Sequence, residues 1–578
     1  MTPSFSIIRK VFLVFSLFFS QLIIGQTLLF GESANSRGVA YAYGSSVYGG
    51  GVSFADFNND GWDDLTYATD ETKEVYFFQN NNGTFTQVDL GINHLNRVKQ
   101  VLWVDYDNDG DKDFLATSIT GINKFYRNDG NLSFTDITNT CGLFTDNLFT
   151  YGATFGDMDN DGDLDVFISN RDETFTQHNY LYRNDGGTFT DVTTSVGINL
   201  GSELSFCASF FDYDNDGDQD IYVANDKVAN INRLYQNNGN GTFTDVSVSS
   251  GAGIAIDAMS TTIGDYNKDG WFDVYVTHTN GNNLLKNNGD GTFTNVAVAT
   301  GTSFDSIAWG AVFLDADNDT ELDLYVSGML DGSDPNRISA AFYHNQGDGT
   351  FVIPNNIGFH NDTKSSFANA IGDVNNDGLP DIVVMNNGGE NNFLWENKTI
   401  TSNSWIKIKL EGVTSNKDGI GNKIEIHANG ESQYRYTVCG EGYLGQNSSS
   451  EFVGLKDATN IDYIKVTWNT TGQVETINNI TPNQSITIQE GNGVLSTDDE
   501  NFSNLSIYPN PSDDGLFYIK NPTQESLNYR VFNILGKELT KGTFSLETSI
   551  DLSSFSSGIY LVKVSSSNKS QAYRIVKK

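Results

Sequence analysis

Residues 157–165 read Asp-Met-Asp-Asn-Asp-Gly-Asp-Leu-Asp, and this nine-residue pattern decides the fold. It recurs at residues 56–64, 105–113, 212–220, 265–273, 315–323 and 373–381, which makes seven copies. From one first Asp to the next the steps are 49, 52, 55, 53, 50 and 58 residues. A period of this length indicates one structural unit used seven times.

The sequence around each copy predicts short strands. An apolar stretch precedes each copy, a β-rich run such as 220–224 follows it, and turns containing Asn-Gly or Asp-Gly separate later apolar runs. Such turns are strong hairpin signals. Each repeat thus holds about four strands, which is the content of one β-propeller blade. We therefore expect an all-β chain with a seven-bladed propeller over residues 26–400.

Two further features favour a closed ring. Small residues recur five places before the first Asp, where the innermost strands would crowd around the axis: Gly51, Gly152, Cys207, Ser260, Gly310 and Ala368, with Gln100 as the exception. The seventh repeat lacks its fourth strand, while Phe30 and Gly38 have the same spacing as Phe189 and Gly197 in a complete repeat. Residues 27–32 are therefore predicted to complete the seventh blade and to cover its open edge.

The acidic pattern is suited to calcium. Ca²⁺ takes six to eight oxygen ligands, and alternate residues of a tight loop can direct side chains inward at positions 1, 3, 5 and 9, with the carbonyl of position 7 added. The predicted ligands, one set per loop, are Asp56, Asn58, Asp60, Trp62 and Asp64; Asp105, Asp107, Asp109, Asp111 and Asp113; Asp157, Asp159, Asp161, Asp163 and Asp165; Asp212, Asp214, Asp216, Asp218 and Asp220; Asp265, Asn267, Asp269, Trp271 and Asp273; Asp315, Asp317, Asp319, Glu321 and Asp323; Asp373, Asn375, Asp377, Leu379 and Asp381. Up to seven Ca²⁺ ions are expected, one per blade.

Alternatives to this interpretation remain open. An EF-hand would place Glu at position 12, whereas position 12 is apolar or aromatic in every copy, from Tyr67 to Val384. Seven acidic turns without metal are the other possibility, although three or four carboxylates within a few ångströms repel one another. The sixth loop departs most from the pattern, because Thr320 stands where the others have Gly.

Residues ~45–398 resemble the FG-GAP/VCBS repeats of integrin α-subunit-like propellers. A second module, 401–493, includes Trp405-Ile-Lys-Ile-Lys-Leu-Glu-Gly412 and Gly440-Glu-Gly-Tyr-Leu-Gly-Gln446. It resembles the ASPIC/UnbV domain that follows FG-GAP repeats in the cartilage acidic protein family, with Lys417 and Asn422 where the family more often has Arg and Ala. Its residues alone predict a β-sandwich or barrel, and the Gly-rich turns are either structural or a ligand-facing edge.

Both ends of the chain predict export. Residues 1–25 contain Arg9 and Lys10 before a 14-residue apolar run, Val11–Ile24. That run is shorter than the ~20 residues of a membrane span, so a signal peptide is favoured over an anchor. After a linker at 494–503, residues 504–578 resemble the C-terminal sorting domain of the type IX secretion system of Bacteroidota. The resemblance implies that the secretion machinery recognises the tail. Short alternating strands predict an immunoglobulin-like β-sandwich for it.

Composition narrows the function. The chain has 73 Asp+Glu against 34 Lys+Arg, a formal net charge of -39, which excludes a nucleic-acid-binding surface. Its six His form no metal-spaced pair and its three Cys no disulfide framework. Trp62 and Trp271 either brace their loops or stack on sugar rings.

We therefore expect a secreted or outer-membrane-surface protein that binds an extracellular glycan or protein in adhesion or recognition, with no transmembrane helix in the mature chain. A polysaccharide-degrading lyase or hydrolase on a propeller scaffold is the alternative, and a structural surface-layer component is a third reading.

Overall fold

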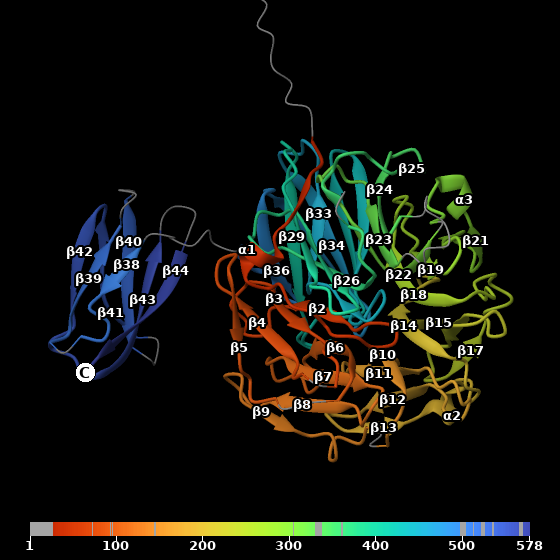
Figure 1. The fold of residues 1–578 in the computed structure, drawn as a ribbon. Coiled ribbons are helices and arrows are strands. Elements are labelled where there is room, and N and C mark those ends of the chain that lie inside the picture. The colour runs from red at the N-terminus through yellow and green to blue at the C-terminus, as the bar shows by residue number, and fades with distance from the viewer. Residues whose placement is uncertain are drawn as a thin grey trace, which may run out of the picture.

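The computed structural model describes residues 27–578 except 72, 93, 95, 144–145, 305, 330–337, 360–361, 498–504, 513, 522–525, 534–536 and 566–569. The predicted signal peptide therefore lies outside the described residues. The described chain is almost entirely β-structure, and its helices are single turns: α1 (Ala34–Arg37), α2 (Thr193–Val196) and α3 (Ala297–Thr300) (Figure 1). None of these helices is long and apolar enough to cross a membrane.

The repeats form seven antiparallel sheets of four repeat strands each, within the described residues. The first three sheets are β2 (Val52–Ala55), β3 (Asp64–Tyr67), β4 (Tyr76–Asn80), β5 (Phe85–Val88); β6 (Val98–Val104), β7 (Asp113–Ser118), β8 (Lys124–Asn128), β9 (Phe134–Asp136); and β10 (Thr150–Gly156), β11 (Asp165–Asn170), β12 (Tyr180–Asn184), β13 (Phe189–Asp191). The next two are β14 (Ser205–Phe211), β15 (Asp220–Asn225), β16 (Arg233–Asn237), β17 (Phe243–Asp245); and β18 (Ala258–Gly264), β19 (Asp273–His278), β20 (Asn283–Asn287), β21 (Phe293–Asn295). The last two are β22 (Ile307–Leu314), β23 (Asp323–Met329), β24 (Ala340–Asn345), β25 (Phe351–Val352); and β26 (Ser366–Gly372), β27 (Asp381–Asn386), β28 (Phe393–Asn397), β1 (Phe30–Glu32).

The first strands of the seven sheets follow one another in cyclic order. Each of β2, β6, β10, β14, β18 and β22 contacts the first strand of the next sheet, and β26 contacts β2. Small residues permit this approach. A Cβ atom added to Gly152 would lie 2.5 Å from the carbonyl oxygen of Phe206 on the neighbouring sheet, which is too close for any side chain. Each acidic loop joins the first and second strands of its sheet, so all seven loops lie at the same end of their sheets.

The N-terminal segment supplies the outer strand of the seventh sheet. β1 pairs antiparallel with β28, with Phe30 opposite Asn397. The helix α1 then ends at Gly38, whose φ of 84° is left-handed, just as α2 ends at Gly197 with a φ of 98°. The constant spacing of Phe and Gly thus reflects a strand, one helical turn and a left-handed residue that ends the turn. Gly is favoured at that last position because it has no Cβ atom.

Residues 405–497 form two more four-stranded sheets around their own apolar core. One contains β33 (Ser450–Gly454), β29 (Trp405–Glu411), β36 (Gln484–Gln489) and β37 (Gly493–Thr497); the other contains β31 (Glu431–Tyr436), β30 (Lys423–Ala428), β34 (Ile461–Trp468) and β35 (Gln473–Ile480). We call this unit the second domain. Its last strand β37 runs into the predicted linker, because Ser496 and Thr497 pair with β36. The rest of that linker, 498–503, lies outside the described residues.

One turn of the second domain enters the centre of the ring of first strands. Strand β32 (Gly445–Gln446) pairs in parallel with β2. Cys439 forms a backbone β-bridge with Phe155, and Gly442 forms one with Thr261. Tyr443 is fully buried and its hydroxyl donates to the carbonyl of Tyr48 at 2.7 Å. The Gly-rich turn at 440–446 is therefore an internal packing element and not a ligand-facing edge.

Residues 506–577 contain a three-stranded and a four-stranded sheet with a separate core, drawn in blue in Figure 1. Their strands are β38 (Ser506–Tyr508), β39 (Leu516–Lys520) and β42 (Glu547–Asp551); and β41 (Glu538–Phe544), β40 (Leu527–Asn533), β43 (Gly558–Ser565) and β44 (Ser570–Lys577).

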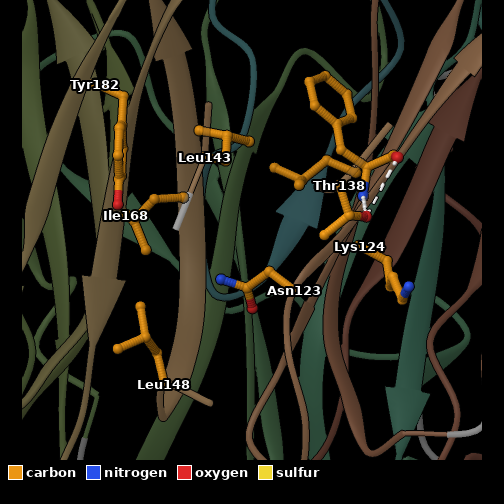
Figure 2. A pocket seen from close by; sticks show the side chains of 9 residues that line it. Asn123, Lys124, Thr138, Leu143, Leu148, Ile168 and Tyr182 are labelled. Atoms are coloured by element: carbon orange, nitrogen blue, oxygen red, sulfur yellow. Dashed lines mark hydrogen bonds between the residues drawn. The ribbon is translucent and has the colours of Figure 1, made fainter. Parts of the chain in front are cut away.

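The sheets of the repeats pack closely against one another. Between the second and third sheets lies a cavity of only about 10 Å³. Figure 2 shows Leu143, Leu148 and Ile168 lining it, with Thr138 hydrogen-bonded to the backbone beside it. That is room for roughly one water molecule, so this cavity is too small to hold a ligand.

The buried ring of Phe30 makes the role of β1 testable. Phe30 is 2% exposed and packs against Phe342 and Phe359, so Phe30→Ala should lower the free energy of unfolding by about 3–5 kcal/mol. The neighbouring Leu29 is 36% exposed, and Leu29→Ala should change it by about 0.5 kcal/mol or less. Denaturant titration measures both. Equal effects of the two variants would show that β1 does not hold the seventh sheet.

Candidate metal-binding loops

The seven acidic loops share one backbone conformation. Their fourth residues have φ between 55° and 59°, and their sixth residues have φ between 78° and 95°. Asn fills the fourth position in six loops and Gly the sixth position in six, as the left-handed region favours. Thr320 takes the Gly position of the sixth loop with a φ of 78°, so this loop keeps its shape at some cost in backbone strain.

The first Asp of each loop holds the turn together. One carboxylate oxygen accepts the N–H of position 5 at 2.9–3.1 Å, and the other accepts the N–H of position 6 at 2.8–3.0 Å, in all seven loops. The residue at position 5 in turn accepts the N–H of position 7. These bonds curl the loop, which brings its oxygen atoms to the inside.

The ninth residue anchors each loop to its sheet. One carboxylate oxygen of this buried Asp accepts the backbone N–H of an Asn at the end of the third strand, at 2.7–2.9 Å in all seven sheets. The seven asparagines are Asn80, Asn128, Asn184, Asn237, Asn287, Asn345 and Asn397. Their recurrence was visible in the sequence, but their role was not predicted.

The same asparagines link neighbouring loops. In six of the seven, the side-chain amide donates to the carbonyl of position 2 in the preceding loop, at 2.7–3.1 Å. Asn80 of the first sheet donates to Val374 of the seventh loop at 3.0 Å. Asn376 of the seventh loop donates to the carbonyl of Gly61 in the first loop at 3.4 Å. The last loop is therefore bonded to the first.

Three loops gather carboxylates closely enough to share an ion. Oxygen atoms of positions 1, 3 and 9 lie within 4.8 Å of one another in Asp105, Asp107 and Asp113; Asp157, Asp159 and Asp165; and Asp212, Asp214 and Asp220. Ligands at 2.3–2.6 Å from one Ca²⁺ ion have such separations. The position 5 side chains of these loops, Asp109, Asp161 and Asp216, are not part of these groups.

Several oxygens in the loops have no partner. Among the described residues, one buried oxygen each of Asp107, Asp159 and Asp214, at position 3, accepts no hydrogen bond, and the same holds for Asp64 and Asp273 at position 9. Buried carboxylate oxygens are rarely left in this state, because burial without a partner is costly. A cation bound inside the loop would satisfy these atoms, so the residues present fit an oxygen-ligated metal.

Three of the remaining loops have Asn in place of Asp as their third residue. Asn58 and Asn375 stand at position 3 of the first and seventh loops, and each donates its amide to the carboxylate at position 5. Asn267 occupies the same position in the fifth loop. An amide oxygen still offers a ligand but no charge. At position 7, Trp62, Trp271 and Leu379 can offer a metal only their backbone carbonyls. Where position 7 is acidic, the side chain can instead face the neighbouring loop, as Asp163 does when it accepts the amide of Asn108.

The sixth loop adds a histidine that the sequence did not single out. His344, on β24, lies with Asp317 and Asp319 in one group of possible metal ligands, and its Nδ1 is 2.9 Å from Asp323 Oδ1. The hydrogen bond with Asp323 raises the pKa of His344 to about 9. A ring nitrogen suits Zn²⁺ and related metals better than Ca²⁺, which prefers oxygen. The sixth loop is thus chemically distinct from the others.

Burial strongly affects the charge of the loop carboxylates. Desolvation raises the pKa of Asp157 to about 6, of Asp105 and Asp212 to about 7, and of Asp64 and Asp113 to about 9. These carboxylates resist ionisation in the absence of a cation. A bound cation would have the opposite effect, because it favours the ionised form.

The second domain lies over the face of the repeats that carries the acidic loops, and it places lysine side chains beside them. The Lys407 ammonium is 3.6 Å from Asp373, and that of Lys409 is 4.0 Å from Asp56. Lys423 donates to Asn215 and to the carbonyl of Gly270, both at 2.7 Å. The Thr470 hydroxyl donates to Asp157 at 2.7 Å. The loops are therefore a domain interface as well as a candidate metal site.

These features define an all-β repeat protein with acidic loops on one face, and the comparisons give its family. Residues 56–326 and 331–384, more than half of the chain, match the FG-GAP-like repeat in six consecutive segments, so the protein belongs to the FG-GAP-like repeat family. Residues 412–495 match the ASPIC and UnbV family. Residues 506–578 match the secretion system C-terminal sorting domain, so the chain is exported by type IX secretion to the cell surface or the extracellular space.

Individual proteins are more distant. No curated protein matches the chain. One solved structure, of an Agrocybe aegerita lectin that recognises non-reducing terminal N-acetylglucosamine, has 20% identity, covers 53% of this chain and 81% of its own, and has a TM-score of 0.36. The V. cholerae biofilm matrix protein Bap1 has 11% identity, covers 93% of this chain and 76% of its own, and has a TM-score of 0.30. These scores are too low to support an argument about function.

The raised pKa values predict how stability depends on pH. A carboxyl whose pKa is higher in the folded than in the unfolded protein stabilises the fold below pH ~4 and loses that contribution as pH rises through the folded value. In a chelator, the melting temperature should therefore fall between pH 5 and pH 8, because the folded protein keeps protons on Asp157, Asp105 and Asp64 over parts of this range while the unfolded chain has lost them. Added Ca²⁺ should raise it by an increment that grows over the same range.

Calorimetric melting at several pH values, with Ca²⁺ and with a chelator, measures that increment, and Mg²⁺ at equal concentration is the control for ionic strength. An increment that shrinks as pH rises would contradict the assignment of the buried carboxylates to a cation site.

Proposed function

We propose that this protein is a secreted or surface-displayed, calcium-binding, seven-bladed β-propeller that acts in adhesion or in recognition of an extracellular glycan or protein. The observation that carries the proposal is the set of buried loop oxygens without hydrogen-bond partners, repeated at equivalent positions of several loops. The sorting domain supports the extracellular setting, where weak sites of 10⁻⁴–10⁻³ M are useful for Ca²⁺.

Three contacts support a closed propeller. β26 contacts β2, Asn376 donates to Gly61, and β1 completes the sheet of β26–β28. The seven sheets would then be the blades, with the turn at 439–446 filling the central channel. For the tail, two sheets around one core are consistent with the expected immunoglobulin-like sandwich.

Calcium would be held by positions 1, 3, 5 and 9 and by the carbonyl of position 7. The groups around Asp107, Asp159 and Asp214 provide the strongest support, since each combines three close carboxylates with a partnerless oxygen. When bound, the ion would supply charge neutralisation and would cross-link the loop to the start of the second strand. The protein's own bonds from positions 1 and 9 orient the oxygens before binding.

Recognition rather than catalysis is the proposed activity, because the buried acidic residues at positions 1 and 9 of the loops are already committed to holding the loops, as Asp157 and Asp165 are. The loops and the second domain that lies over them form a fixed framework of the kind on which binding sites are built.

The Asp159→Asn variant tests the calcium proposal. It keeps the shape of the side chain but removes one of three close carboxylates, so Ca²⁺ should raise the melting temperature by about 2 °C less than in the unchanged protein. Native mass spectrometry should show about one Ca²⁺ fewer per chain. The control is Asp89→Asn, which changes an exposed acid outside the loops. If both variants bind and respond to Ca²⁺ like the unchanged protein, the third loop is not a calcium site.

A further inference from the structure

A cleft of about 650 Å³ opens between the repeat loops and the second domain. Its lining comes mainly from the fourth loop, the fifth loop and the sheet of β30, β31 and β34, and it includes Asp216, Asp269, Trp271, Lys423, Tyr434 and Lys465. Two other spaces at the domain boundary have only about 80 and 30 Å³. The cleft is in the size range of small-molecule sites, and domain boundaries are where such sites often form.

Two aromatic side chains line the cleft from opposite domains. Trp271 is half-buried at position 7 of the fifth loop, and its indole packs against Gly289, where a Cβ atom would lie 2.9 Å away. Tyr434 of β31 is also half-buried and covers Gly270, whose added Cβ would lie 3.4 Å from the ring. Each ring thus packs against backbone on one side. Rigid aromatic surfaces suit apolar faces of a ligand and lose little entropy on binding.

The polar groups of the cleft are mainly hydrogen-bond acceptors. Asp216, Asp218 and Asp269 provide carboxylates, while Thr467 and Asn469 add a hydroxyl and an amide. Carboxylates and amides form strong hydrogen bonds with hydroxyl donors. Aromatic rings beside many acceptors are complementary to a sugar, which has apolar C–H faces and several hydroxyls.

The charge of the cleft selects among sugars. Its two lysines are committed, because Lys423 donates to Asn215 and Gly270, and Lys465 pairs with Glu425. Desolvation also lowers the pKa of Lys423. The fourth and fifth loops carry eight acidic residues, so the charge around the cleft stays negative even with one Ca²⁺ in each loop and the two lysines. A sulfated or uronic-acid polysaccharide would therefore be repelled. The chemistry favours a neutral glycan.

We propose that this cleft binds a short neutral oligosaccharide, with Trp271 and Tyr434 against the sugar rings and the carboxylates on the hydroxyls. The inference rests on the proposed function in recognition and assigns the ligand class and the place where it binds. A protein partner at the same cleft is the outcome that would overturn it.

Trp62 provides a matched control for Trp271. It occupies position 7 of the first loop, is half-buried like Trp271, and does not line the cleft. The full chain and its Trp271→Ala, Trp271→Phe and Trp62→Ala variants should be applied in Ca²⁺ buffer to an array of neutral and anionic oligosaccharides. The glycans retained should then be titrated by calorimetry, with melting temperatures as the test of folding.

We expect the unchanged protein to bind neutral oligosaccharides. Trp271→Ala should weaken binding at least about tenfold, Trp271→Phe less, and Trp62→Ala less than about twofold, at similar melting temperatures. Binding of neutral glycans that is equally insensitive to both tryptophans would overturn the cleft but leave recognition intact. Binding of anionic glycans alone would overturn the ligand class. Absence of binding to any glycan would contradict both the cleft and glycan recognition as the function.

Discussion

The structure depends on burying one aspartate carboxylate in every repeat. This residue, at the ninth loop position, is 0–1% exposed in all seven sheets. One oxygen accepts the N–H of the Asn on the third strand, and in five loops the other accepts the N–H of position 2. In the other two loops, those of Asp64 and Asp273, the second oxygen has no partner. A charge in this position joins loop to sheet, but only if its burial is compensated.

In our account, two sources of positive charge compensate for the burial of the loop carboxylates. Bound cations would neutralise the groups around Asp107, Asp159 and Asp214, which have the closest carboxylates. The second domain supplies Lys407 and Lys409 beside the seventh and first loops, where Asn replaces the Asp at position 3. The domain is therefore part of the electrostatic balance of the loops, and its inserted turn also fills the space inside the ring. This arrangement relates the net charge of -39 to the interior of the protein as much as to its partners.

Local repetition made much of the fold predictable from sequence. The nine-residue pattern, the small residues such as Gly152 and the spacing of Phe30 and Gly38 each report a constraint within one repeat or between adjacent repeats. The inserted turn at 439–446 and the position of Lys407 were not predictable, because they depend on contacts between segments hundreds of residues apart. His344 was missed for a related reason, since β24 places it beside Asp317 although 26 residues separate them in the sequence.

The central claim is that cations occupy the loops, and a crystal structure of the full chain grown with Ca²⁺ tests it most directly. We predict density for an ion at about 2.3–2.6 Å from oxygens of Asp157, Asp159 and Asp165, with equivalent ions in the second and fourth loops. Loops that keep the same conformation at saturating Ca²⁺ but hold only water beside Asp159 would contradict it.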